Sequence, residues 1–156
     1  MALRRIQKEL EDIKNNPSRE WDAGPLNESD LFHWQGTIMG PENTPYEGVY
    51  FFLNINFPTH YPLEPYKIIF TTRIYHPHIN SNGHLHCCEY SELFLKTDPG
   101  NWNPSMTIRK GLDLITKSLK NIEVYCDGWN FECASMFLKD RKEFDRIARE
   151  WTKKYA

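Results

Sequence analysis

The chain has 156 residues, of which 40% are apolar and 14% aromatic, and 19 basic side chains against 21 acidic ones give a net charge of −2. This composition excludes a disordered chain, and the charge balance argues against a nucleic-acid binder, which usually carries a strong positive excess. The longest continuous apolar run, Val49 to Leu53, has five residues, whereas a membrane helix needs about 20. We therefore expect one domain over residues 1–156, without a membrane segment or signal peptide.

The first predicted element is an amphipathic helix. Its apolar residues recur at steps of three and four positions, which places them on one helical face. They are Leu3, Ile6, Leu10 and Ile13. The helix is expected to end at Pro17 and Ser18, because proline disfavours a continuing helix.

Three predicted strands follow the helix. Apolar and polar residues alternate from Asp30 to Met39 and again from Val49 to Phe57, and Lys67 to Thr72 forms a third β-rich run. The Gly- and Pro-containing stretch at 40–45 marks a turn between the first two. Because the connections are short, an antiparallel meander is expected, since parallel strands need crossovers of about a dozen residues or more.

A long loop and two helices complete the chain. Residues 74–104 show no clear period, and a loop of about 30 residues in a small domain usually has a function. Helical periodicity returns from Thr107 to Lys120 and from Asp140 to Tyr155. The order helix, strands, loop, helices indicates an α+β fold.

The long loop concentrates the residues that carry chemistry, with four of the six histidines and two of the four cysteines between His76 and Glu89. A cysteine beside imidazoles suits a nucleophile, because polar neighbours stabilise the reactive thiolate. Histidine and thiolate are also zinc ligands, but adjacent cysteines rarely point at one ion and the sequence has no C-x2-C pair. A polar loop without a joint role is the third interpretation.

Several stretches match one known family in order and spacing. They are residues 1–10 (MALRRIQKEL), 32–41 (FHWQGTIMGP), 57–58 with 61–62 (FP and YP), 70–77 (FTTRIYHP) and 146–155 (RIAREWTKKY). On these residues the chain resembles a ubiquitin-conjugating enzyme of the small class that is little more than the catalytic core. The resemblance covers the chain except for about 83–101 and 117–137.

The resemblance implies both a fold and an activity. The fold is a four-stranded antiparallel sheet with an N-terminal helix and C-terminal helices, and we expect the fourth strand within or just before the histidine-rich loop. The activity is acyl transfer: a cysteine accepts ubiquitin from the activating enzyme as a thioester and passes it to a substrate lysine with a RING or HECT type ubiquitin ligase. No bound cofactor is expected, because ATP is used by the upstream activating enzyme.

The catalytic loop departs from the family in two ways. The family triplet His-Pro-Asn, whose Asn supports the loop and the oxyanion, is His-Pro-His at 76–78. An imidazole N–H can also donate to an oxyanion, so His78 is a candidate catalytic residue, with loop shaping as the alternative role. The family cysteine follows its glycine by three residues, a position held here by His86. One inserted residue aligns Cys87, and Cys88 is the alternative nucleophile.

Two carboxylates are candidates for handling the proton of the incoming lysine. Glu89 stands where the family has Asp two residues after its cysteine, which favours Cys87 as the nucleophile. Asp127 matches the family carboxylate that helps to deprotonate the lysine. A free lysine with a pKa near 10.4 is protonated at pH 7, and a carboxylate can take its proton or orient the amine. For both residues, a solvated surface carboxylate is the alternative.

Two more departures lie beyond the predicted nucleophile. Residues 90–101 contain an insertion, because the family's Trp loop follows its cysteine more closely than Trp102 does here. The stretch 121–129 replaces the family's Asp-Pro-rich segment. Cys126 and Cys133 are expected to be structural thiols.

The resemblance also implies surfaces that bind partners. Basic first-helix residues match positions that meet the activating enzyme and ligases, although an ordinary charged helix face is the alternative. Leu63 replaces a family Phe in the first ligase-contact loop, which reduces the apolar contact, and a second loop follows Trp102. The expected partner-binding residues are Arg4, Arg5, Lys8, Leu63, Pro104 and Ser105.

Three functions follow from these observations. The first is a ubiquitin-conjugating enzyme that uses Cys87. The second is a catalytically inactive variant that binds ubiquitin or ligases. The third is a metal-binding interaction module using His76, His84, His86 and Cys87. For the enzyme we expect a monomer in the cytoplasm, with the nucleus as a second compartment. Its expected partners are ubiquitin, the activating enzyme, ligases and protein substrates, and no nucleic acid, membrane or metal.

Overall fold

An antiparallel sheet forms from the alternating segments of the sequence. The computed structural model describes residues 1–85, 102–124 and 131–156. Its strands pair in sequence order as a meander, which confirms the predicted topology. The strands are β1 (Trp21–Asn27), β2 (Asp30–Met39), β3 (Tyr50–Asn56) and β4 (Lys67–Phe70).

The fourth strand is not where we expected it. It is β1, which precedes the three predicted strands and pairs with β2, whereas the expectation placed it in or just before the histidine-rich loop. β1 contains Gly24 and Pro25, residues that weaken a strand pattern, and its register shifts between Pro25 and Asn27. Proline is tolerated there because β1 is an edge strand, where a backbone N–H can be missing without breaking the sheet.

The predicted helices are present, with bounds close to the expected ones. They are α1 (Ala2–Asn15), α2 (Ile108–Lys120) and α4 (Arg141–Tyr155). Thr107 and Asp140 precede the two later helices as N-caps, because their side-chain oxygens accept bonds from the backbone N–H groups of Lys110 and Glu143. A further helix, α3 (Phe131–Lys139), occupies a range for which the sequence analysis predicted no element.

The buried face of α1 differs from the predicted stripe. Leu3 is 46% exposed and Leu10 is only partly buried. The fully buried positions of the helix are Ala2, Ile6, Glu9 and Ile13. The helix therefore turns a small residue and an acidic residue toward the core, and Glu9 enters the site described below.

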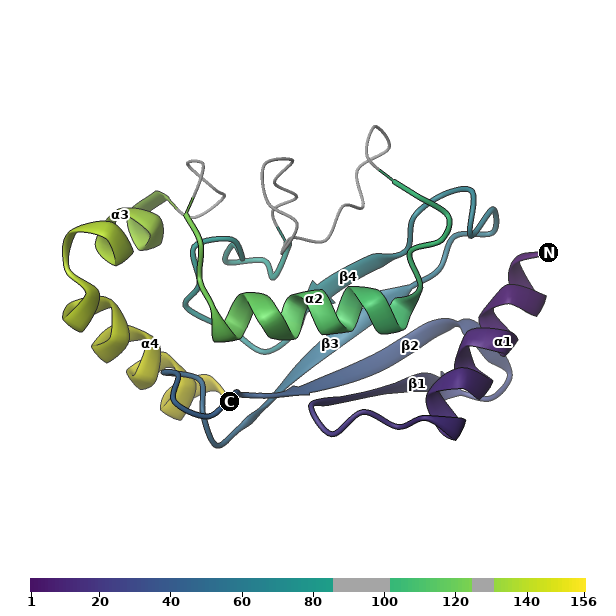
Figure 1. Cartoon of the computed structure of the whole chain (residues 1–156), viewed down its shortest axis with the longest axis horizontal. Coiled ribbons are helices and arrows are strands. Elements are labelled where there is room, and N and C mark those ends of the chain that lie inside the picture. Colours follow the sequence, from purple (N-terminus) through teal and green to yellow (C-terminus); the bar gives the residue numbers. More distant parts are fainter. Residues whose placement is uncertain (86–101, 125–130) are drawn as a thin grey trace.

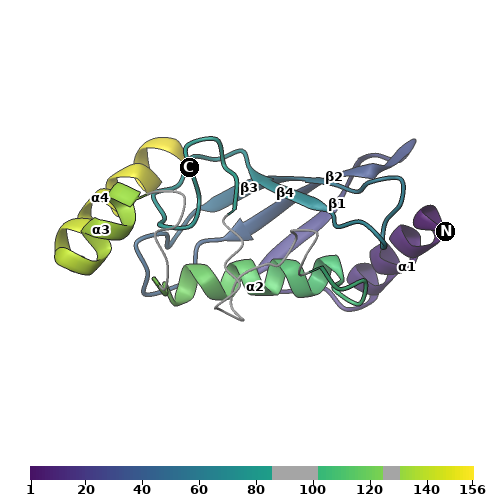
Figure 2. The same cartoon turned by 90° about the horizontal axis from the view of Figure 1, so that it is seen from above.

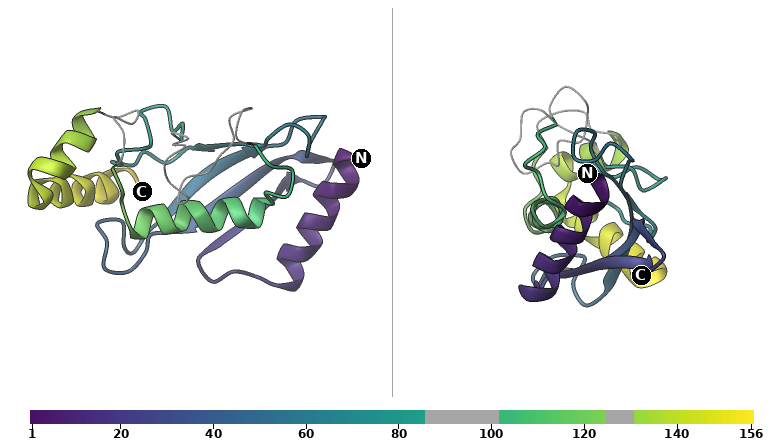
Figure 3. Two further views of the ribbon diagram at one scale, coloured as in Figure 1. Left: turned by 45° about the horizontal axis from the view of Figure 1, so that its top comes forward. Right: turned by 90° about the vertical axis from the view of Figure 1, so that its right-hand side faces the viewer.

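The helices lie on one face of the sheet and at the two ends of the molecule. α2 lies along one face of the sheet, α1 lies at one end of the molecule, and α3 and α4 lie at the other end (Figures 1 and 2). Figure 3 shows the same elongated arrangement, with the N-terminus and α4 far apart. The predicted stripe of α2 is buried with the inner residues of β2 and β3 in one core. No helix of the described residues is long and apolar enough to cross a bilayer.

Candidate functional site

The histidine-rich turn packs against the end of α2. His76 is 1% exposed; its Nε2 lies 3.2 Å from the carbonyl oxygen of Ser118, and its Nδ1 accepts the backbone N–H of His78 at 3.0 Å. A carbonyl only accepts and a backbone N–H only donates, so the ring carries its proton on Nε2 and is neutral. Burial, with a smaller contribution from the His78 ring, lowers the pKa of His76 to about 3.

His78 lies in the same buried turn. It is 2% exposed, and its Nε2 donates to the carbonyl oxygen of Glu123 at 2.5 Å. This bond joins the turn to the segment after α2. The Nε2 proton already has an acceptor, so donation from that atom to an oxyanion would need the ring to move. The catalytic role of His78 stays a prediction, and the geometry favours its alternative role in shaping the loop.

The same turn also contacts the strand-like residues that follow it. Ile79 forms a β-bridge with Leu85, while His78 bonds to Glu123. Leu85 is the last described residue before the predicted nucleophile, and Glu123 lies just before the second segment outside the described structure. The two chain segments that continue toward Cys87 and Asp127 therefore leave the described structure beside one turn.

The residues between Asn80 and His84 are fixed to the edge of β4. The Asn80 side-chain oxygen accepts backbone N–H groups from Asn82 and His84, and the N–H of Phe70 donates to the Gly83 carbonyl at 2.9 Å. Gly83 has φ +83°, and a Cβ at this position would lie 1.9 Å from the Phe70 carbonyl oxygen. Only glycine allows this close approach of the two backbones.

The predicted nucleophile and its carboxylate partners fall outside the described residues. Cys87, Cys88 and Glu89 lie in 86–101, and Asp127 lies in 125–130 together with Cys126. Cys133, expected to be structural, is 0% exposed in α3. Burial raises the pKa of the Cys133 thiol to about 12, so this thiol is protonated near neutral pH and is a poor nucleophile.

The metal interpretation has little support among the described residues. No group of three or more His, Cys, Asp or Glu side chains comes together within residues 1–85, 102–124 and 131–156. Both ring nitrogens of His76 are engaged in hydrogen bonds, whereas His84 is exposed. The two other proposed ligands, His86 and Cys87, lie outside the described residues.

The predicted partner-binding residues lie on three neighbouring segments. Arg4 and Lys8 are exposed on α1, Leu63 is 65% exposed on the loop before β4, and Pro104 and Ser105 are exposed before α2. Lys8 and Ser105 line the same groove between α1 and the beginning of α2. We call the five residues the partner surface, and they are Arg4, Lys8, Leu63, Pro104 and Ser105.

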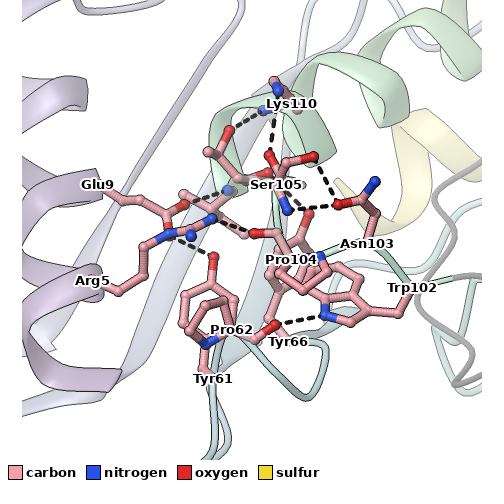
Figure 4. A network of polar contacts seen from close by, with 12 residues as sticks. Arg5, Glu9, Tyr61, Pro62, Tyr66, Trp102, Asn103, Pro104, Ser105 and Lys110 are labelled. Carbon is pink, nitrogen blue, oxygen red and sulfur yellow. Dashed lines mark hydrogen bonds and ion pairs between the residues drawn. The ribbon is translucent and has the colours of Figure 1, made fainter. Parts of the chain in front are cut away.

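Arg5 plays a different part from the other two basic residues of α1. It is partly buried, its Nε donates to Glu9 at 2.8 Å, and its Nη2 donates to the Pro104 carbonyl at 2.7 Å (Figure 4). Burial alone lowers the pKa of Arg5, but the bond and charge of Glu9 outweigh it and raise the pKa above the usual value. The guanidinium therefore joins α1 to the 102–107 segment.

Two residues that connect these segments were not among the predicted site residues. Tyr61 donates its hydroxyl to Glu9 at 2.5 Å, and Trp102 donates its indole N–H to the Pro62 carbonyl at 2.8 Å (Figure 4). Burial, followed by the contact with Glu9, holds the pKa of Tyr61 well above its usual range. One signal was available: Glu9 stands at helical spacing from Ile6 and Ile13 on the buried face.

Two comparisons with known proteins point to the same family. Residues 5–152 match the family model described as "Ubiquitin-conjugating enzyme". The chain is also similar to a crystal structure of a "putative ubiquitin conjugating enzyme" from Plasmodium yoelii, with 39% sequence identity and a TM-score of 0.84. That alignment covers 99% of this chain and 95% of the Plasmodium chain.

Proposed function

Because the chain belongs to the ubiquitin-conjugating enzyme family, we propose that it accepts ubiquitin on Cys87 as a thioester and transfers it to lysine. The observation that carries this proposal is the family match over residues 5–152, which extends on both sides of the histidine-rich loop. Two further observations support it. The turn that precedes Cys87 in the chain is bonded to β4 and to the end of α2, and Arg5 links α1 to the segment that carries Pro104.

The proposed reaction is two acyl exchanges. In the first, the Cys87 thiolate attacks the carbonyl carbon of the ubiquitin C-terminal glycine, which the activating enzyme holds as a thioester. A new C–S bond forms, the old one breaks, and the activating enzyme's thiolate leaves. In the second, a neutral lysine amine attacks the same carbon, the Cys87 thiolate leaves, and an isopeptide bond forms. The proton lost by the amine goes to water or to a carboxylate, with Glu89 and Asp127 as candidates.

The partners of this reaction are part of the proposal. Ubiquitin and the activating enzyme supply the acyl group, and a RING or HECT type ligase brings the protein substrate. We assign the partner surface to the activating enzyme and the ligase, and we place the reaction in the cytoplasm. ATP is consumed upstream, by the activating enzyme.

A charging assay tests the proposal directly. The protein is incubated with ubiquitin, ATP and a ubiquitin-activating enzyme, and the products are separated on denaturing gels with and without a thiol reductant. We expect a ubiquitin adduct that the reductant removes. If a well-characterised conjugating enzyme charges under these conditions and this protein does not, the protein is an inactive variant that binds its partners without accepting ubiquitin.

Two matched variants locate the thioester. Cys87→Ser should give no reductant-sensitive adduct, or a stable oxyester, because an alkoxide is a much poorer leaving group than a thiolate. Cys88→Ser makes the same chemical change one residue later and should still charge. The reverse pattern would move the nucleophile to Cys88.

A further inference from the structure

Glu9 is a buried acidic side chain with three donors around it. It is 6% exposed, and it is the only buried acidic residue in the described ranges 1–85, 102–124 and 131–156. Its Oε2 accepts from Arg5 Nε at 2.8 Å and from the Tyr61 hydroxyl at 2.5 Å, and its Oε1 accepts from the Ile108 backbone N–H at 2.7 Å. An ionised carboxylate is a pure acceptor and suits three converging donors, which offset the cost of burying its charge.

The three donors come from three different segments of the chain. Arg5 belongs to α1 itself, Tyr61 to the loop before β4, and Ile108, 99 positions after Glu9, is the first residue of α2. The first N–H groups of a helix have no partner within it, so a carboxylate at this end is doubly favourable, as an acceptor and as a charge near the positive end of the helix dipole. Glu9 therefore determines where α2 begins relative to α1.

Each of these segments continues directly into the partner surface. Leu63 lies two residues after Tyr61, and Arg5 extends from Glu9 to the Pro104 carbonyl. Trp102 bonds to the carbonyl next to Tyr61, and its ring lies 5.3 Å from that of Tyr66. The Tyr66 hydroxyl in turn donates to the Thr107 carbonyl at 3.0 Å. The 102–107 segment, which carries Pro104 and Ser105, and the loop that carries Leu63 are thus linked to α1 by one network that includes Glu9 (Figure 4).

We propose that Glu9 is a positioning residue that sets the relative placement of α1, the Leu63 loop and the 102–107 segment, and thereby the affinity of the partner surface. Glu9 is 6% exposed and is one of the residues that line the groove between α1 and the beginning of α2. The effect of Glu9 on ubiquitin charging rests on the proposed function. Its effect on the placement of the three segments does not depend on that function. Removing the carboxylate should weaken docking of the activating enzyme. The rate of ubiquitin transfer within the bound complex should stay nearly unchanged.

Three variants separate the possible roles of this carboxylate. Glu9→Ala leaves all three donors without their acceptor. Glu9→Gln keeps an amide oxygen for the Ile108 N–H and a group that Tyr61 can contact, but its NH2 cannot accept from Arg5. Glu11→Ala is the matched control, because it removes the same charge from an exposed position of the same helix. In both measurements below, we expect the largest change for Glu9→Ala, a smaller change for Glu9→Gln, and the smallest for the control Glu11→Ala.

The first measurement follows the geometry without any enzymatic activity. In two-dimensional 1H–15N NMR spectra of the full chain, the side-chain signals of Arg5 and Trp102 are compared between wild type and variants. Trp102 has no hydrogen bond to Glu9 and is linked to it through Pro62 and Tyr61, so a shift of its indole signal reports that the change extends beyond the donors of the carboxylate. We expect it to shift in Glu9→Ala, to shift less in Glu9→Gln, and to stay in place in Glu11→Ala. An unmoved Trp102 signal in a folded Glu9 variant would overturn the proposal.

The second measurement separates docking from folding. The initial charging rate is measured at a series of concentrations of each variant. The active concentration is taken as the fraction of the variant that becomes charged when excess activating enzyme drives the reaction to its endpoint. We expect the KM of Glu9→Ala to rise on the order of tenfold, the scale of one well-placed interface contact, with kcat within about twofold of wild type. A merely structural role would lower the chargeable fraction and leave the corrected KM unchanged, which contradicts the proposal.

The two measurements test the proposed function and the positioning role of Glu9 separately. If wild-type protein does not charge at all, the proposed function is lost, and the Trp102 signal alone decides whether Glu9 positions the three segments. If Glu9→Ala does not fold, Glu9→Gln carries both measurements, since it keeps the acceptor at the start of α2.

Discussion

Gly48 and Gly83 have the same backbone conformation but different surroundings. Their φ angles are +90° and +83°, a region that side chains with a Cβ rarely adopt. A Cβ on Gly48 would meet no atom within 4 Å, whereas one on Gly83 would overlap the backbone of Phe70. The pair therefore separates the effect of backbone strain from that of a steric clash.

We predict that Gly83→Ala is much more destabilising than Gly48→Ala. The Gly48 change should lower the free energy of unfolding by about 1–2 kcal/mol, the strain of a positive φ. The Gly83 change adds a clash with backbone that cannot move without separating the 80–84 turn from β4, and it should cost about 3 kcal/mol or more. Urea unfolding of both variants checks this; equal losses would mean that the turn moves away from β4 at little cost.

At the scale of elements, the end of α2 is held by the histidine turn as well as by its own C-cap, where the backbone N–H of Asn121 donates to the Lys117 carbonyl. Ser118, in the last turn of α2, accepts from the His76 imidazole, and Glu123 accepts from that of His78, so the histidine turn ties the segment after α2 to the rest of the fold. The His76 ring in particular accepts a backbone N–H through Nδ1, which is possible only when that nitrogen carries no proton.

We predict that His76 contributes stability that is lost in acid. Its pKa is near 6.5 when unfolded and about 3 in the folded protein, so between these values the unfolded state binds more protons. The free energy of unfolding therefore rises with pH, and the contribution is fully present above about pH 6.5. Between pH 7 and 4.5 the loss should be on the order of 2–3 kcal/mol.

His76→Gln tests this prediction, because the amide can donate to Ser118 and accept from the His78 N–H but does not titrate. Urea unfolding at pH 7, 5.5 and 4.5 should show a steeper loss of stability in wild type than in the variant. The variant keeps His78 and the carboxylates, but the His78 ring contributes to the lowered pKa of His76, so the comparison reports His76 together with this coupling. Parallel curves would mean that protonating His76 costs the folded protein no more than the unfolded one.

At the scale of the whole molecule, α1 presents exposed basic side chains although the net charge of the chain is only −2. Arg4 and Lys8 are exposed on α1 beside the predicted ligase loops, whereas Lys14 is exposed on a different face of the same helix. Charges at the rim of an interface mainly change the association rate, and salt screens them.

We predict that Lys8→Glu slows charging by the activating enzyme, whereas Lys14→Glu, the same charge change elsewhere on α1, does not. The effect should be on the order of tenfold in kcat/KM at low salt and should shrink toward 1 M salt, where the screening length is about 3 Å. Both variants should keep the wild-type stability within about 1 kcal/mol, because both side chains are exposed. Equal rates for the two variants would remove α1 from the partner surface.

The local pattern of the chain was enough to predict much of this fold. α2 and α4 follow from apolar residues at steps of three and four, β2 and β3 follow from alternation, and β4 follows from a β-rich run, because these patterns arise among residues that are neighbours in the chain. The family resemblance added the expectation of a fourth strand and the proposed activity. β1 was missed because Gly24 and Pro25 interrupt its pattern, and its pairing with β2 is what makes it a strand.

The candidate site depended far more on contacts between distant residues. The sequence predicted which segments bind partners, but it could not separate Arg5, which joins α1 to Pro104, from the exposed Arg4 and Lys8. The burial of Glu9 and its bond to Ile108, 99 positions away, exist only once α1 and α2 are packed together. The tautomer of His76 likewise depends on a carbonyl 42 positions away in α2. Periodicity reports on near neighbours along the chain, whereas hydrogen-bond partners, burial and pKa values come from side chains that only folding brings together.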